Sequence, residues 1–287
     1  MDAASSDAPV NYPPDPHLLR DLALWLEDEA GCYSAGFEIT PWLCNPGGVR
    51  AGVIATLVDV IGGAEATRAV RPNWVATCDL MLHLADCPAT GAVIARSRLL
   101  RRGRSTAVIE VDLRGEESDG ASVGLATLTF SVLESRTELQ QRDPRTYPAR
   151  TEFFSKGPGL EAPIFDRLGV RPAPGAPGDL ELASASYNLN SLNATQGGAL
   201  ALLVEASAEA AVSQPGEASG VVRDLEIHYL ALGRTGPFRA HPRILRRGSE
   251  STLVRVDLVD TGADDRPVAM ATASLESPAA RDAKRVS

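Results

Sequence analysis

Apolar residues along this chain fall into two long unbroken runs and a series of shorter alternating runs. The long runs are AGVIATLVDVIGGAEATRAV from Ala51 and GGALALLVEASAEAAVS from Gly197. Both lack Pro, are rich in Ala, and are apolar nearly all round, which predicts two buried helices.

After each predicted helix come four alternating or β-branched stretches of the kind that forms strands. In the first half they cover residues 75–84, 92–102, 105–114 and 122–133, and in the second half 220–230, 237–247, 251–260 and 267–276. A buried helix lying on a curved antiparallel sheet is an α+β arrangement. The pattern predicts this arrangement twice.

The two halves also repeat in sequence. LLRRGRSTAVIEVDL at 99–113 and ILRRGSESTLVRVDL at 244–258 share seven of fifteen residues at an offset of 145 (244 − 99), which also superposes Asp79 on Asp224. We interpret the chain as a tandem duplication whose sheets pair edge to edge. The predicted domains are residues 16–135 and 161–277, joined by a linker at 136–160, with disordered ends at 1–15 and 278–287.

Composition narrows the classes of function. The chain has 287 residues, and 37 acidic against 28 basic residues give a net charge of −9. This balance argues against a nucleic-acid binder, which needs a basic excess. The sequence contains no run of 18 consecutive apolar residues, so no membrane span is expected. Its four cysteines are scattered along the chain, which favours a reducing, cytoplasmic location. The four histidines lack the spacing of metal ligands, so no metal is expected.

Residues around the two helices resemble the hotdog-fold acyl-CoA thioesterases of the phenylacetate-pathway type, whose signature is approximately N-x-x-G-x-x-H-G-G-x-x-x-T-L-x-D. In the second half, Asn190, Gln196, Gly197-Gly198 and Glu205 fall on the Asn, His, Gly-Gly and acidic positions. In the first half, Arg50-Ala51-Gly52 replaces His-Gly-Gly and Asp59 takes the acidic position.

The resemblance implies a double hotdog, meaning two tandem domains that each wrap a curved sheet around a central helix. It implies a role in fatty acid metabolism and an acyl-CoA thioester as the substrate, with coenzyme A entering only as part of that substrate and no separate cofactor. It is also compatible with a homo-oligomer.

Thioester hydrolysis needs a group that activates water or attacks directly, and donors for the developing oxyanion. A carboxylate in the middle of an apolar helix is costly to bury, which favours a function for Asp59 and Glu205. The backbone N–H of Gly197 at a helix N-terminus is suited to polarising a thioester oxygen. Gly197 and Glu205 are about 12 Å apart along one helix, so one carbonyl cannot reach both.

Antiparallel central helices would bring the N-terminus of each helix to the middle of the other. One predicted composite site therefore pairs Asp59 with Gly197, Gln196 and Asn190, and the other pairs Glu205 with Ala51, Arg50 and Asn45. In the resemblance, Thr77 falls where the family carries a hydroxyl beside the catalytic water, and its counterpart is Val222. The Asp59 site is the more complete, so we expect it to carry the chemistry, with Asp59 as general base or nucleophile.

Basic clusters at two predicted strand turns are candidates for the phosphates of coenzyme A. They are Arg101-Arg102-Gly103-Arg104 and Arg246-Arg247-Gly248, and the resemblance places basic residues here. Arg102, Arg104 and Arg247 are the predicted phosphate ligands, because the guanidinium fork suits phosphate.

Two other functions stay open beside the thioesterase. The loss of the His-Gly pairs is compatible with a non-catalytic acyl-CoA binding protein. A hotdog enoyl-CoA hydratase is the third hypothesis, although it needs an acid paired with a His near the helix and neither predicted helix contains one.

Overall fold

The computed structural model describes residues 12–29, 31–116, 122–135, 149–213, 220–278 and 280–281. In these residues a mostly antiparallel sheet is combined with few helices. The two longest helices are α2 (Ala51–Val70) and α5 (Gly197–Val212), as the apolar runs predicted. The short helical segments are α1 (Leu18–Asp21), α4 (Ile164–Leu168), η1 (Pro41–Leu43), η3 (Ser186–Asn188) and η4 (Thr261–Ala263).

Four long strands follow each of the two helices. After α2 they are β5 (Trp74–Leu84), β6 (Ala92–Arg102), β7 (Thr106–Gly115) and β8 (Ser122–Leu133). After α5 they are β12 (Val221–Tyr229), β13 (Phe238–Arg247), β14 (Ser251–Asp260) and β15 (Arg266–Glu276). All eight lie within two residues of the predicted ranges.

Short strands extend the sheet at both edges. They are β1 (Trp25–Glu29), β2 (Cys32–Glu38), β9 (Arg150–Glu152), β10 (Arg171–Pro172) and β11 (Leu180–Leu182), while β3 (Cys44–Asn45) and β4 (Gly48–Val49) form a separate pair. The order in the thirteen-stranded sheet is β10-β11-β13-β14-β15-β12-β5-β8-β7-β6-β2-β1-β9. The two halves therefore meet where β5 pairs with β12, edge to edge, as the repeat predicted.

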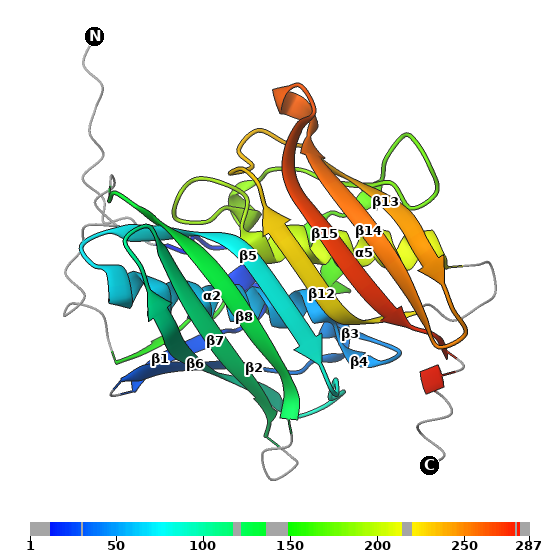
Figure 1. Cartoon of the computed structure of the whole chain (residues 1–287). Coiled ribbons are helices and arrows are strands. Elements are labelled where there is room, and N and C mark those ends of the chain that lie inside the picture. The colour runs from blue at the N-terminus through cyan, green and yellow to red at the C-terminus, as the bar shows by residue number, and fades with distance from the viewer. Residues whose placement is uncertain are drawn as a thin grey trace.

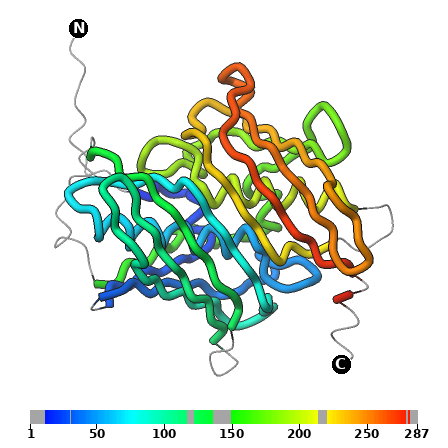
Figure 2. Tube along the Cα trace, viewed as in Figure 1, coloured from blue at the N-terminus to red at the C-terminus, as the bar shows by residue number. Residues whose placement is uncertain are grey.

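The repeat is visible in the sheet as well as in the sequence. The register shifts between Thr77 and Asp79 on β5, and between Val222 and Asp224 on β12, which are matching positions at the offset of 145. Figures 1 and 2 show the two halves side by side, with the sheet passing in front of α2 and α5. The helices run in opposite directions, because Gly52 at the start of α2 lies against Leu202 of α5 and Gly198 at the start of α5 lies against Thr56 of α2. Each N-terminus therefore lies near the middle of its partner.

The core lies between the sheet and the two helices. α5 is buried from Gly198 to Glu209, and α2 is buried over most of its length, since both helices are covered by strands and by one another. α2 ends at Val70 because Arg71 precedes Pro72 and has extended ψ, which is the conformation that a residue before proline favours.

The prediction of disorder at the N-terminus is wrong for residues 12–15. Asp15 accepts a hydrogen bond from the backbone N–H of Lys156 at 2.9 Å, and Tyr12 packs edge-on against His17. Residues 1–11, residues 136–148 of the predicted linker, and most of 278–287 lie outside the described residues. No helix in the described ranges combines the length and the apolar character needed to cross a membrane.

Candidate active site

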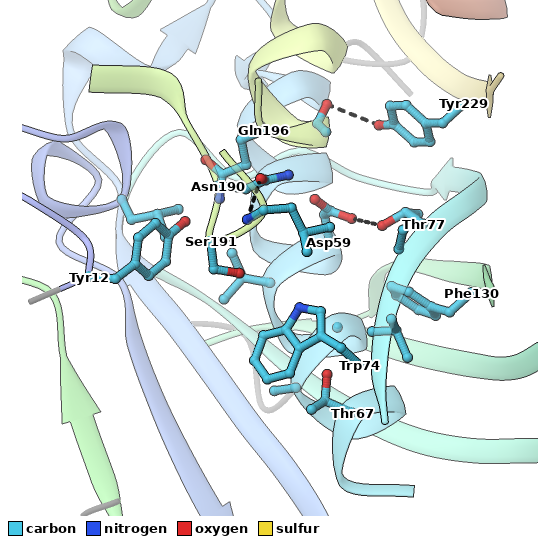
Figure 3. Close-up of a pocket in the computed structure, with 18 of the residues that line it drawn as sticks. Tyr12, Asp59, Thr67, Trp74, Thr77, Phe130, Asn190, Ser191, Gln196 and Tyr229 are labelled. Atoms are coloured by element: carbon cyan, nitrogen blue, oxygen red, sulfur yellow. Dashed lines mark hydrogen bonds between the residues drawn. The ribbon is translucent and has the colours of Figure 1, made fainter. Parts of the chain in front are cut away.

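A cavity of about 730 Å³ lies between the two halves and is lined by residues of both. The first half contributes the middle of α2 and the start of β5, and the second half contributes the segment before α5 and the end of β12. Five residues predicted from sequence line it together, as Figure 3 shows for most of them: Asp59, Thr77, Asn190, Gln196 and Gly197.

Asp59 lies in the middle of α2 and points toward β5. Its Oδ1 accepts a hydrogen bond from the Thr77 hydroxyl at 2.6 Å. Burial raises the pKa of Asp59 from 3.8 to about 6, and the bond from Thr77 opposes the rise because it stabilises the ionised form. The carboxylate therefore ionises close to neutral pH, where a general base is most effective.

The first turn of α5 approaches the same carboxylate from the other half. A Cβ atom on Gly197 would lie 2.8 Å from Asp59 Oδ2 and 3.1 Å from the Tyr229 hydroxyl oxygen, so any larger residue here would displace the Asp59 carboxylate. The N-cap residue Gln196 makes no side-chain bond to the first-turn amides. Since first-turn N–H groups have no partner within a helix, these donors are available beside Asp59.

Two side-chain amides complete this end of the cavity. Gln196 is 4% exposed, and its Oε1 has no hydrogen-bond partner among the described residues. Asn190 uses its Oδ1 to hold the following loop, accepting from the N–H of Leu192 at 2.9 Å and of Ala194 at 3.1 Å. The Asn190 bonds fix the loop that leads into α5, while the Gln196 side chain, whose Oε1 has no partner among the described residues, is suited to a bound ligand.

Two tyrosines near Asp59, Tyr12 and Tyr229, were not identified from sequence. The Tyr229 hydroxyl donates to the carbonyl oxygen of Gly197 at 3.0 Å, which ties the end of β12 to the first turn of α5. Tyr12 lines the cavity from a segment predicted to be disordered. Burial raises the pKa of both phenols, and the negative charge of Asp59 adds to the effect, so both remain protonated donors at neutral pH.

The second predicted composite site is assembled differently. Glu205 is fully buried on α5, and its carboxylate accepts from the backbone N–H of Ala51 at 3.2 Å and of Gly52 at 2.8 Å. Burial raises the pKa of Glu205 to about 7, and the charge of Glu209 adds to the rise, while Arg50 and the two amides oppose it. The first-turn amides of α2 are thus already occupied.

Arg50 and Asn45 pair with Glu209 rather than with an open cavity. The Arg50 guanidinium lies 2.9 Å from Glu209 Oε2 and 3.8 Å from Glu205 Oε1, and Asn45 Nδ2 donates to Glu209 Oε1 at 3.1 Å. The structure brings these predicted residues together, but as a closed cluster of buried hydrogen bonds and ion pairs.

Comparison with known proteins gives one match to a domain family. Residues 190–275 match the model of the acyl-CoA thioesterase N-terminal domain. The chain resembles the acyl-CoA thioesterases, as its sequence predicted. No curated protein sequence matches the chain.

Solved structures share the fold. A candidate thioesterase II from Thermobifida fusca aligns with a TM-score of 0.60 at 17% identity, covering 91% of this chain and 98% of that one. A candidate oleoyl thioesterase from Lactobacillus plantarum gives 0.59 at 12% identity (87% and 97%), and a 12:0-ACP thioesterase from Umbellularia californica gives 0.58 at 9% identity (86% and 95%). At these identities the structures show the fold, and the domain match supports a thioester hydrolase.

The thioesterase resemblance also predicted arginines beside coenzyme A, and the structure separates them. Arg247 pairs with Thr252, which pairs with Leu275, which pairs with Val222. This row of paired residues crosses the start of β12, whereas the Asp59 cavity lies at the end of β12. At about 3.3 Å per residue, the two ends of the strand are about 20 Å apart. Arg247 is therefore at the Glu205 end of the molecule.

The other predicted phosphate ligands lie nearer the Asp59 cavity without lining it. Arg102 pairs with Ala107, Ala107 with Phe130, and Phe130 with Thr77, so Arg102 lies three strands from Thr77 in one row of the sheet. Arg104 lies in the turn that follows, and neither residue is in the cavity wall.

Proposed function

We propose that this protein is an acyl-CoA thioesterase built as a double hotdog, with one working site between its two domains. The observation that carries the proposal is the position of the Asp59 carboxylate. It lies between the hydroxyl of Thr77, at 2.6 Å, and the first turn of α5 at Gly197, in a cavity that both halves line.

In the proposed reaction, Asp59 acts as a general base on water held near Thr77. The water oxygen attacks the thioester carbonyl carbon, its proton passes to the Asp59 carboxylate, and the carbonyl oxygen becomes an oxyanion. The N–H of Gly197 and the amide side chains of Gln196 and Asn190 are the candidate donors to that oxyanion. Collapse breaks the carbon–sulfur bond, and the proton returns to the departing thiolate.

The apolar part of the cavity suits an acyl group. Beyond Asp59 the wall is formed by Val60 and Gly63 on α2, by Phe130 on β8, and by Leu19 and Phe153. A volume of about 730 Å³ lies within the range of small-molecule sites, and burial of hydrocarbon supplies binding free energy. We place the acyl chain along α2, with its carbonyl at Asp59.

The Glu205 cluster is not proposed as a second working site. Its carboxylate already accepts from the amides that would have to bind the oxyanion. A substrate oxygen would have to displace a buried, doubly bonded carboxylate.

We also propose that the protein is cytoplasmic and acts in fatty acid metabolism. The four cysteines are unpaired, and free thiols persist in a reducing compartment.

The proposal is tested by incubating the protein with saturated and aromatic acyl-CoA esters and measuring the release of the coenzyme A thiol. We expect turnover of at least one acyl class and its loss in Asp59→Asn. Tight binding of acyl-CoA without any release of thiol would favour the non-catalytic binding protein instead. The hydratase alternative loses support, because no histidine is among the described residues that line the cavity.

A further inference from the structure

A second, smaller cavity adjoins the Asp59 cavity on the side of the loop after β12. It has a volume of about 370 Å³ and shares Leu232 with the first cavity. Its walls come from that loop and from the turn between β14 and β15: Leu232, Arg234, Thr235, Asp260, Ala263 and Arg266. We call this cavity the arginine pocket.

Arg234 is held in place by backbone carbonyls. Its Nη1 donates to the carbonyl oxygens of Leu192 at 2.8 Å and Asn193 at 3.3 Å, in the loop that Asn190 organises. Arg234 and Arg266 are both exposed, and within the described residues neither forms an ion pair with a carboxylate. A guanidinium that is fixed on one side keeps further N–H donors for a ligand.

The acidic residue of the arginine pocket is already occupied. Asp260 is 3% exposed, and its carboxylate accepts from the backbone N–H of Thr235 at 3.1 Å and of Gly236 at 2.8 Å. It therefore shapes the loop that carries Arg234. The pocket consequently offers two arginine side chains and a threonine hydroxyl to an anion.

The backbone connects this pocket to the reaction centre. The carbonyl oxygen of Gly233 accepts from the N–H of Thr195 at 2.7 Å, and Thr195 directly precedes Gln196 and Gly197. Gly233 lines the Asp59 cavity, and Arg234 is the next residue along the chain. A ligand with its carbonyl at Asp59 can thus extend past Leu232 toward Arg234.

Another arginine of the cavity wall, Arg68, is less suitable for an added phosphate. Arg68 lines the far end of the Asp59 cavity, but it is paired with Glu65 and with Asp28, the latter at 3.2 Å. In a chain of net charge −9, an anionic group requires a local positive site.

We propose that Arg234 and Arg266 bind the phosphate groups of the phosphopantetheine-bearing carrier of the thioester. The inference rests on the proposed function for its orientation, since the acyl chain runs along α2 and the carrier leaves by the opposite side, over Leu232. It assigns the phosphates to a different set of arginines from the one the sequence predicted.

The test compares Arg234→Ala/Arg266→Ala with wild type on two substrates that share one acyl group. One is the coenzyme A ester, and the other is the N-acetylcysteamine thioester, which lacks phosphates. We expect KM for the coenzyme A ester to rise about tenfold or more at low salt, with kcat nearly unchanged. Kinetics on the N-acetylcysteamine thioester should not change.

Two further double variants, with the same change in charge, make the comparison specific. Arg98→Ala/Arg243→Ala removes two exposed strand arginines outside both cavities and should leave KM at the wild-type value. Arg102→Ala/Arg104→Ala tests the rival site, and a rise in KM there with none in Arg234→Ala/Arg266→Ala would overturn the proposal.

Calorimetry of coenzyme A binding at two salt concentrations tests the arginine pocket independently of whether the protein hydrolyses thioesters. We expect Arg234→Ala/Arg266→Ala to weaken binding about tenfold or more and to reduce its dependence on salt. Equal affinity in the variant and wild type would overturn the arginine pocket even if hydrolysis is observed. Weaker binding without hydrolysis by wild type would retain the pocket and reject the thioesterase.

Discussion

Asp59 and Glu205 occupy matching positions on α2 and α5, but the Glu205 side chain is longer by one methylene group. The longer Glu205 side chain contacts the N–H groups of Ala51 and Gly52 directly. Asp59 instead bonds to Thr77 and lies beside Gly197. One carboxylate therefore caps a helix, and the other faces a cavity.

The pH dependence of turnover reports on Asp59 and Thr77. Since Asp59 must be ionised to act as a base, kcat/KM should rise with pH and level off above a pKa of about 6. Thr77→Val removes the hydrogen bond that lowers this pKa, so the rise should move to higher pH. Thr77→Ser keeps the hydroxyl and should restore the wild-type profile. Identical profiles for wild type and Thr77→Val would contradict the assignment of the base.

The same buried carboxylate should reduce folding stability at alkaline pH. Its pKa is raised in the folded protein from 3.8 to about 6, so its stabilising contribution is present below about pH 4 and is lost as pH rises through 6. Asp59→Asn should therefore be more stable than wild type at pH 8, by up to about 3 kcal/mol, and closer to it at pH 5. Denaturant unfolding at both pH values measures the difference, and a less stable variant at pH 8 would contradict the account.

At the scale of elements, the face of α2 that lines the cavity has no side chain at Gly63, where we place the acyl chain. Gly63 is one turn after Asp59, about 6 Å along the helix. A Cβ there would meet only Phe130 Cε1, at 3.9 Å, so alanine fits without strain. A larger side chain at this position would project into the cavity.

We therefore expect Gly63→Leu to shorten the acyl chains that the enzyme accepts. The side chain would occupy the cavity about five carbons beyond the carbonyl, so esters longer than about six carbons should lose tenfold or more in kcat/KM, while short esters are retained. Gly63→Ala is the matched control and should keep the wild-type preference. Equal loss on every chain length would show that the acyl group does not follow α2.

The elements that the sequence predicts well are those whose pattern is local. α2, α5 and the eight long strands match their predicted ranges because each is long and its apolar residues are close together in the sequence. β1 was missed because Trp25–Glu29 is a short, acidic, partly exposed strand near the edge of the sheet, where alternation is weak. β10 and β11 are also too short to show a pattern.

The candidate site was predictable where the repeat supplied long-range information. Superposing the two copies placed Gly197 opposite Asp59, which no local pattern could do. Tyr229 was missed because a tyrosine in a strand is usually only a good strand former, and its bond to Gly197 depends on tertiary contact. The closed state of Glu205 was missed because it depends on side-chain reach.

At the scale of the whole molecule, each half completes the other. β5 pairs with β12 from His83 opposite Asp224 to Asp79 opposite His228, and Gly198 packs so closely on Thr56 that a Cβ would lie 2.7 Å from the Thr56 Cα. Separating the halves would expose a strand edge and one face of each long helix.

Residues 1–150 expressed alone should accordingly be insoluble or self-associated. Size-exclusion chromatography and thermal unfolding of this fragment, beside the full chain as control, provide the measurement. A well-folded monomer with a sharp transition would contradict the mutual dependence of the halves.

The most direct test of the central claim compares Asp59→Asn with Glu205→Gln in turnover of one acyl-CoA ester, each corrected for its folded fraction. The account predicts that Asp59→Asn lowers kcat about a hundredfold or more, because it removes the base, whereas Glu205→Gln costs far less. Loss of activity in Glu205→Gln with retention in Asp59→Asn would contradict the account and move the reaction to the Arg50 side of the molecule.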